Sequence, residues 1–246
     1  GEKDYRPVFR ALAESLAAGA PAQAISYHPR KGAPQSAEWF HGDRWLAFNS
    51  IQEWPDRQMP HVTADWARTP VKPTWLFEGR YEGYWRGNYK AADWGEWQVR
   101  QQAWQTVFAG AFGHTYGHER VFGFGFDRAD WKAALEAPGA RSVGQLARLM
   151  GRLSSDEFMG REPAPYLIDG DAGKAERLKS TAVVALRTGT AAKAFFYSAN
   201  GRAFRVKTAG LAAGSLFAFW FDPRLGTWRR GGDASAEPEW FARDIP

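Results

Sequence analysis

The first two-thirds of the chain alternate short apolar runs with longer amphipathic stretches. Residues 6–18 carry an apolar residue at every fourth position (Val8, Leu12 and Leu16), which is typical of a helix with one apolar face. This stretch stops at Gly19, a common helix C-terminal signal. Apolar runs with the length of buried strands lie at 24–27, 46–51 and 74–77. Further helices are predicted over 96–111 and, after a Ser142 cap, to about Leu153.

Strands that alternate with helices in this way predict an α/β domain with a parallel sheet and helical crossovers. From about Ala164 the pattern changes to short apolar runs separated by Gly, Asn and Pro. The strands expected there are 181–187, 194–197, 204–207, 215–221 and 227–230. This spacing predicts a small antiparallel β-sandwich. We therefore divide the chain into an α/β domain over residues 1–160 and a β domain over 161–246.

One predicted strand ends directly in a carboxylate. The run 74–77 is followed by Glu78, and a second carboxylate, Glu82, lies in the aromatic-rich segment after it. Barrel enzymes present catalytic groups at the carboxyl ends of parallel strands, and glycosidases use a pair of carboxyl groups. The alternative is an ordinary strand end with solvated glutamates.

The aromatic content adds a candidate ligand. The 246 residues include 13 Trp, 17 Phe and 8 Tyr, and thirteen tryptophans exceed what packing usually needs. Flat apolar rings with polar edges suit the faces of sugar rings, so carbohydrate is the expected ligand class. Tyr81 and Trp85 follow Glu78 closely and are candidates for contact with the sugar. Trp39 and Trp94 are further stacking candidates, although burial is the commoner position of any one tryptophan.

Charge and cysteine content argue against several other classes. The net charge is +5, but Lys and Arg are scattered and no basic run is longer than Arg229-Arg230, so nucleic-acid binding is not expected. Without cysteine the chain has no disulfide, no thiolate nucleophile and no Cys-ligated zinc. No run of 18 apolar residues predicts a membrane span. We expect no metal and no other cofactor.

Polar residues follow the other predicted strands. His28 comes after the first strand, and Asn49 and Gln52 flank the end of the second. We expect all three to hydrogen-bond sugar hydroxyls, and the alternative for each is a bond to the backbone at a strand end or loop.

A further polar group follows the long helix. His114, Tyr116 and His118 fall on a predicted strand, where alternation would put all three on one side. Two histidines four residues apart suggest a metal site only on a shared helix face, and no carboxylate or cysteine completes a cluster. The spacing therefore favours the wall of a polar pocket.

Several stretches occur in the order and spacing of one known family. They are Ser26-Tyr-His-Pro29, Trp45-Leu-Ala-Phe-Asn-Ser-Ile-Gln52, Lys72-Pro73 through Glu78, Tyr81-Glu-Gly83, Val99-Arg100, Phe108-Ala-Gly-Ala-Phe-Gly-His-Thr-Tyr-Gly-His118 and Pro138-Gly-Ala-Arg141. With them the chain resembles the apiosidase-like glycoside hydrolases, whose catalytic domain is a (β/α)8 barrel. The resemblance implies a partial barrel with only strands 5–8 visible. The β-rich tail, with Phe219-Trp-Phe-Asp-Pro-Arg224 near its end, is similar to the collagen-binding-type domain that follows this barrel.

The resemblance also implies a reaction. It suggests a retaining hydrolase of glycosidic bonds in plant or microbial polysaccharides, with the nucleophile at Glu78 and Glu82 as a competitor. A Gly-Gly-Asp at the end of the family's fourth strand supplies the acid/base, and Gly1-Glu2 stands there in this chain, so Glu2 would replace the aspartate. A residue so near a chain end is normally frayed. The alternatives are therefore a carbohydrate-binding protein without hydrolysis and, on the label of the tail alone, a structural or adhesive module.

The implied half barrel would expose two strand edges, a known cause of association. The other half of the barrel is either truncated or supplied by another source. Two copies of the chain could pair their exposed strand edges, so we expect a homodimer or larger assembly. A secreted or periplasmic bacterial protein is the expected localisation, which the lack of cysteine allows. The first five residues are not a signal peptide.

Overall fold

The computed structural model describes residues 3–54, 57–85, 94–123, 131–169 and 182–234. Its parallel sheet has the order β1-β2-β4, formed by β1 (Asn49–Gln52), β2 (Thr74–Glu78) and β4 (Gly113–His114). The expected strand at 24–27 contributes one isolated parallel bridge, from Ile25 to Leu46. A second parallel pair, β3 (Tyr81–Glu82) and β5 (Gly117–His118), continues beyond the ends of β2 and β4. The predicted parallel arrangement is confirmed, with shorter strands than expected.

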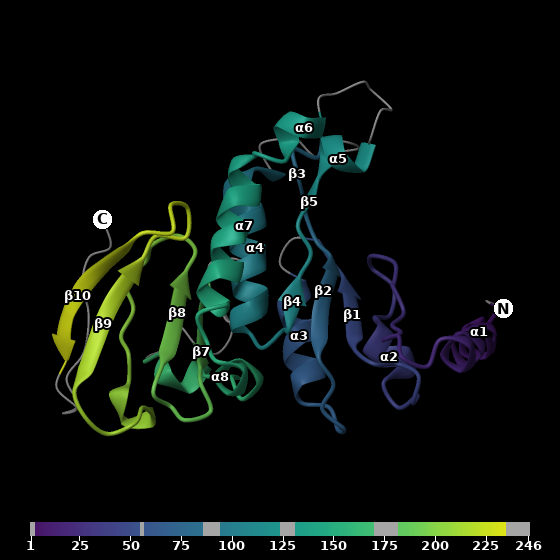
Figure 1. Ribbon diagram of the computed structural model, residues 1–246, viewed down its shortest axis with the longest axis horizontal. Helices are drawn as coiled ribbons and strands as arrows, with labels where there is room; N and C mark the ends of the chain where they lie inside the picture. The colour runs from purple at the N-terminus through teal and green to yellow at the C-terminus, as the bar shows by residue number, and fades with distance from the viewer. Residues whose placement is uncertain (1–2, 55–56, 86–93, 124–130, 170–181, 235–246) are drawn as a thin grey trace.

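Helices flank this sheet and connect its strands. Figure 1 shows α1 and α2 at one end of the molecule, the sheet beside them, and α4 with α7 in the middle. The helices are α1 (Arg6–Gly19), α2 (Ser36–Phe40), α3 (Gln58–Trp66), α4 (Glu96–Phe108), α5 (Glu119–Gly123), α6 (Trp131–Ala134), α7 (Pro138–Met150) and α8 (Ser155–Met159). In the part of the chain that is described, none of them is both long and apolar enough to cross a bilayer.

Alternation along β2 separates two environments. Thr74 and Leu76 are buried, whereas Trp75 and Phe77 are partly exposed on the other face of the sheet. Leu76 belongs to a core built from α3, α4 and α7. This core continues into the C-terminal strands, because the Trp104 ring stacks on the Tyr197 ring with centroids 5.3 Å apart.

Helix α7 begins five residues earlier than expected, because its N-cap is Ala137 and not Ser142. Pro138 lies in its first turn, where a fixed φ suits a helix and a missing N–H costs nothing. Ser142 therefore lies inside the helix and does not cap it, and its hydroxyl donates to the carbonyl of Gly139 at 3.1 Å. Leu146 and Met150 face the core as predicted.

The C-terminal part forms two separate antiparallel sheets. The first has the order β6-β7-β8 and the second pairs β9 with β10. Their bounds are β6 (Glu162–Pro163), β7 (Val183–Arg187), β8 (Ala194–Ser198), β9 (Leu216–Phe221) and β10 (Trp228–Ala234), with 3₁₀ turns at Pro165–Leu167 and Thr208–Gly210. The expected strand at 204–207 is reduced to one bridge between Ile168 and Val206.

Helix α4 lies between the parallel sheet and the C-terminal strands, and ten consecutive residues from Val99 to Phe108 are buried. Buried polar side chains must find partners inside the protein. The Gln102 Oε1 accepts a bond from the Arg80 backbone N–H at 2.7 Å, and its Nε2 donates to the Glu53 carbonyl at 3.2 Å. Gln105 Nε2 donates to the Ala182 carbonyl at 2.9 Å, toward the C-terminal strands. These bonds join the segments that follow β1 and β2 to one helix.

Replacing Gln102 tests this connection. Gln102→Met keeps the side-chain length but removes the acceptor of the buried Arg80 N–H, so we expect the free energy of unfolding to fall by about 1–3 kcal/mol. Urea unfolding followed by tryptophan fluorescence measures it. Gln23→Met changes an exposed glutamine in the same way and should leave the midpoint unchanged. Equal midpoints for the two variants would contradict the role given to Gln102.

Candidate active site

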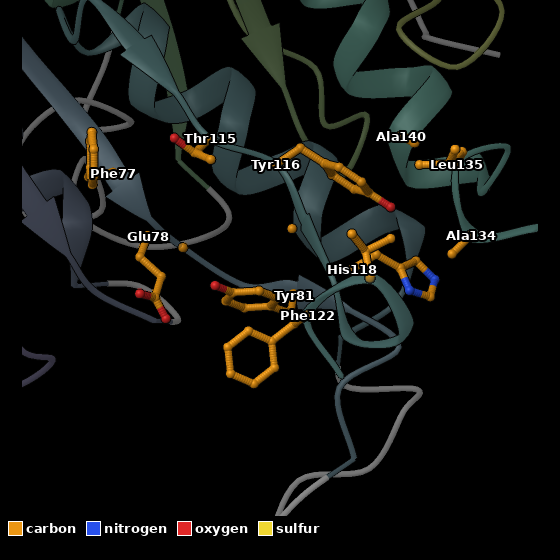
Figure 2. A pocket seen from close by; sticks show the side chains of 13 residues that line it. Phe77, Glu78, Tyr81, Thr115, Tyr116, His118, Phe122, Ala134, Leu135 and Ala140 are labelled. Carbon is orange, nitrogen blue, oxygen red and sulfur yellow. The ribbon is translucent and has the colours of Figure 1, made fainter. Parts of the chain in front are cut away.

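The largest group of predicted site residues lines one pocket of about 450 Å³ beyond the carboxyl end of β2. Figure 2 shows its side chains, which come from β2, β3, the segment through β5, and helices α5 to α7. The lining residues include the predicted Glu78, Tyr81, Tyr116 and His118, together with Phe77, Thr115 and Phe122. The last three were not predicted. The position of Phe77 directly before Glu78 could have indicated its place in the pocket. Nothing in the sequence distinguished Thr115 or Phe122.

Glu78 is the carboxylate at the mouth of this pocket. Its Oε2 lies 3.2 Å from Nε2 of His28, and both side chains are partly exposed. The Tyr81 hydroxyl points toward the Glu78 carboxylate (Figure 2). Burial, reinforced by the charge of Glu78, raises the pKa of Tyr81 to about 12. The phenol therefore stays protonated over the ordinary pH range, with its hydroxyl directed at Glu78.

The backbone after Glu78 is held against α4. Besides the bond from Arg80 N–H to Gln102, the Arg80 Nη1 donates to Gln101 Oε1 at 2.9 Å. A Cβ at Gly79 would lie 2.5 Å from Gln102 Oε1, so a larger residue there would displace the amide that accepts the Arg80 N–H. The position of Glu78 is thus set by a buried helix as well as by the sheet.

Glu82 has a different environment. It is buried, its Oε2 accepts a 2.6 Å bond from the Tyr116 hydroxyl, and its Oε1 accepts a 3.1 Å bond from the Gly139 N–H. Gly139 is in the first turn of α7, where the helix dipole favours a carboxylate. Burial and the bond to Glu82 raise the pKa of Tyr116 above its usual range, while burial lowers the pKa of His118. Glu82 therefore ties β3, β5 and α7 together.

Asn49 lies away from this pocket. Asn49 is the first residue of β1, not the last, so it is buried at the other end of the strand. There its Oδ1 lies 3.1 Å from the His41 Nδ1, and its Nδ2 donates to the Thr74 hydroxyl at 3.3 Å. Gln52, in contrast, ends β1 and pairs with Glu78 in the register.

His114 also lies away from this pocket. It pairs with Leu76 on β4, lines another cavity beside Val107 and Met150, and burial lowers its pKa to about 4. The expectation that His114, Tyr116 and His118 share one side was wrong. The reason is that β4 and β5 are separate short strands with different partners, so alternation does not carry through residues 115–116.

The remaining candidates have simpler outcomes. Trp85 is 59% exposed and does not line the pocket, whereas Trp94 is fully buried against Trp54 with ring centroids 4.9 Å apart. Trp39 packs on Tyr27. Glu2 lies outside the described residues. Among the residues that are described, no group of three or more His, Asp or Glu side chains is placed to hold a metal ion.

The close approach of α7 to Glu82 generates a prediction. In Gly139→Ala the added methyl would overlap the Glu82 carboxylate and lie 2.6 Å from Val99 Cγ2, so we expect a loss of about 1–3 kcal/mol of stability. Gly144→Ala is the matched control on the same helix, because its Cβ meets nothing within 4 Å. Alanine there should stabilise by about 0.5–1 kcal/mol through helix propensity. Thermal and urea unfolding would measure both, and a stable Gly139→Ala variant would contradict the packing described.

Comparison with known proteins agrees with this arrangement. The chain is similar to a glycoside hydrolase family 5 protein from Bacteroides vulgatus ATCC 8482, whose crystal structure superposes with a TM-score of 0.84 at 25% identity over 97% of this chain and 56% of that one. A second solved structure, described as a glycoside hydrolase, gives a TM-score of 0.84 at 26% identity over 96% and 57% of the two chains. The chain thus spans somewhat more than half the length of these structures. No curated protein sequence matches it.

Two family models match consecutive parts of the chain. Residues 163–241 match the model described as "Putative collagen-binding domain of a collagenase". Residues 1–156 match the model described as "Apiosidase-like, catalytic domain". Since that match covers more than half of the 246 residues and includes every described residue around Glu78, the chain belongs to the apiosidase-like family.

Proposed function

We propose that this protein is a retaining glycoside hydrolase in which Glu78 is the nucleophile. The observation that carries the proposal is the difference between the two candidate carboxylates. Glu78 is partly exposed at the pocket, with His28 and Tyr81 beside it, whereas both oxygens of Glu82 are engaged in buried hydrogen bonds. A nucleophile must reach the substrate, and Glu78 meets that requirement.

In this proposal, the Glu78 carboxylate attacks the anomeric carbon to form a covalent glycosyl-enzyme, which water then hydrolyses. The protonated Tyr81 hydroxyl and the His28 ring orient the carboxylate from two sides. Retaining hydrolysis also needs an acid/base carboxyl about 5 Å from the nucleophile. Glu2 is the proposed acid/base from its position in the family motif. The proposed substrates are glycosidic bonds of plant or microbial polysaccharides.

We also propose that the parallel sheet is the second half of a (β/α)8 barrel that a further half barrel completes. The order β1-β2-β4, extended by the Ile25 bridge, supports this assignment. The face of β2 that bears Trp75 and Phe77 is partly exposed. On α1 the predicted apolar stripe is exposed, with Leu12 57% and Leu16 60% accessible. Such surfaces favour association, and a second copy of the chain is the proposed occupant.

Light scattering coupled to gel filtration tests the assembly. We expect a mass at least twice the 27.6 kDa of one chain. A double substitution Leu12→Gln and Leu16→Gln on the exposed stripe should shift the protein toward monomer without unfolding it, since both side chains lie largely in solvent. A monomer at all concentrations for the unsubstituted protein would contradict the proposal.

Activity on a panel of aryl glycosides and plant polysaccharides tests the nucleophile. We expect Glu78→Gln to lower the turnover by at least about a thousandfold, as removal of a nucleophile does elsewhere, while thermal stability is retained. Glu82→Gln should instead lower the melting temperature, because it weakens bonds to Tyr116 and Gly139. Glu136→Gln is the control, since this glutamate is exposed.

Other outcomes separate the alternatives. Full activity in Glu78→Gln would refute the assignment of the nucleophile. Glycan binding without hydrolysis by the unsubstituted protein would favour a carbohydrate-binding role. This role is the second candidate, because the chain spans only somewhat more than half the length of the solved hydrolases.

A further inference from the structure

A second aromatic surface lies on the β9–β10 hairpin. Phe217 and Phe219 are two residues apart on β9, so their side chains share one face of the strand. They are 61% and 57% exposed. Trp228 of β10 is 42% exposed, with its ring centroid 6.5 Å from that of Phe219. Three large exposed rings on one hairpin form an apolar patch of the kind that marks a binding surface.

Two guanidinium groups flank these rings. Arg230 pairs with Phe219 across the hairpin, and its Cζ lies 5.8 Å from the centroid of the Phe217 ring. Arg152, which follows α7, has its Cζ 5.5 Å from the Trp228 ring. Both arginines are exposed. We call Phe217, Phe219, Trp228, Arg152 and Arg230 the aromatic strip.

The strip is anchored at one end in the core. Phe221 lies on the same face of β9. Its ring centroid is 4.8 Å from that of Trp228 and 5.7 Å from that of Trp104 on α4. A surface built on a paired strand and fixed to a buried helix is held in place before any ligand binds. Successive rings on this face repeat at about 6–7 Å, twice the rise per strand residue, which is on the scale of a sugar unit.

The charge distribution points to an anionic ligand. Residues 163–241 contain 11 Lys and Arg against 7 Asp and Glu, a net charge of +4 out of +5 for the whole chain. The excess positive charge therefore belongs to the part of the chain that carries most of the strip. An arginine fork binds carboxylates with two parallel hydrogen bonds, which a neutral sugar does not offer.

We propose that the aromatic strip is a second glycan site, which binds an anionic polysaccharide rich in uronic acids. The rings stack on the apolar faces of the sugars, and the two arginines bind the carboxylates. The site is separate from the pocket at Glu78, because α4 and α7 lie between the parallel sheet and this hairpin (Figure 1). The inference extends the proposed hydrolase function by assigning a site that holds the polymer near the enzyme.

Affinity electrophoresis in gels containing polygalacturonate, neutral galactan or soluble collagen tests the proposal. We expect polygalacturonate to retard the protein and neutral galactan to retard it much less. The double variant Phe217→Ala and Phe219→Ala should weaken binding by about tenfold or more, the effect of losing a central aromatic contact. Arg152→Gln with Arg230→Gln should weaken binding to polygalacturonate and reduce its dependence on salt.

Controls separate this site from the catalytic one. Leu225→Ala removes another exposed side chain of the hairpin (68% accessible) and should bind like the unsubstituted protein. Glu78→Gln should keep full binding to polygalacturonate, and the strip variants should keep their melting temperature and their hydrolysis of soluble aryl glycosides. Retardation by collagen alone, equal retardation by the neutral and anionic glycans, or no effect of the strip variants would each overturn the proposal. Loss of hydrolysis in Glu78→Gln would stand in any of these cases.

Discussion

The fold depends on one helix that is buried along ten consecutive residues. Helix α4 lies between the parallel sheet and the C-terminal strands, so its glutamines cannot turn to solvent. A buried amide without partners would cost more than its hydrogen bonds contribute in net stability, so the surrounding backbone must meet it. Gln102 meets the segments after β1 and β2, and Gln105 meets the C-terminal part. The same contacts that satisfy the helix also position the strand end that carries Glu78.

Two glutamates four residues apart illustrate how environment separates roles. Glu78 ends a strand beside a pocket, and His28 and Tyr81 lie next to it without enclosing it. Glu82 is enclosed by Tyr116 and the first turn of α7. A buried carboxylate is tolerated because two donors and a helix N-terminus compensate for its desolvation. Glu82 thus has a structural role beside the pocket. Glu78 is the carboxylate that is accessible from the pocket.

The two ends of the molecule expose apolar surface for different reasons. On α1 the exposed stripe consists of aliphatic side chains, which suit close packing against another protein surface. On the β9–β10 hairpin the exposed residues are aromatic and lie beside arginines, a combination with both flat faces and charge. The accumulation of positive charge after residue 162 belongs with the second surface, and the first two-thirds of the chain are nearly neutral.

The amino-acid sequence by itself determined the alternation of strands and helices, the change to antiparallel strands near Ala164, and Glu78 as a carboxylate at a strand end, because these depend on local periodicity and on one apolar run. Only the tertiary structure decided that Glu82 is enclosed, that Asn49 lies at the far end of its strand and that His114 faces another cavity. These outcomes depend on strand bounds and on partners distant in the chain. A shift of a few residues in a strand end changes which side chain reaches the pocket, and spacing alone does not encode that shift.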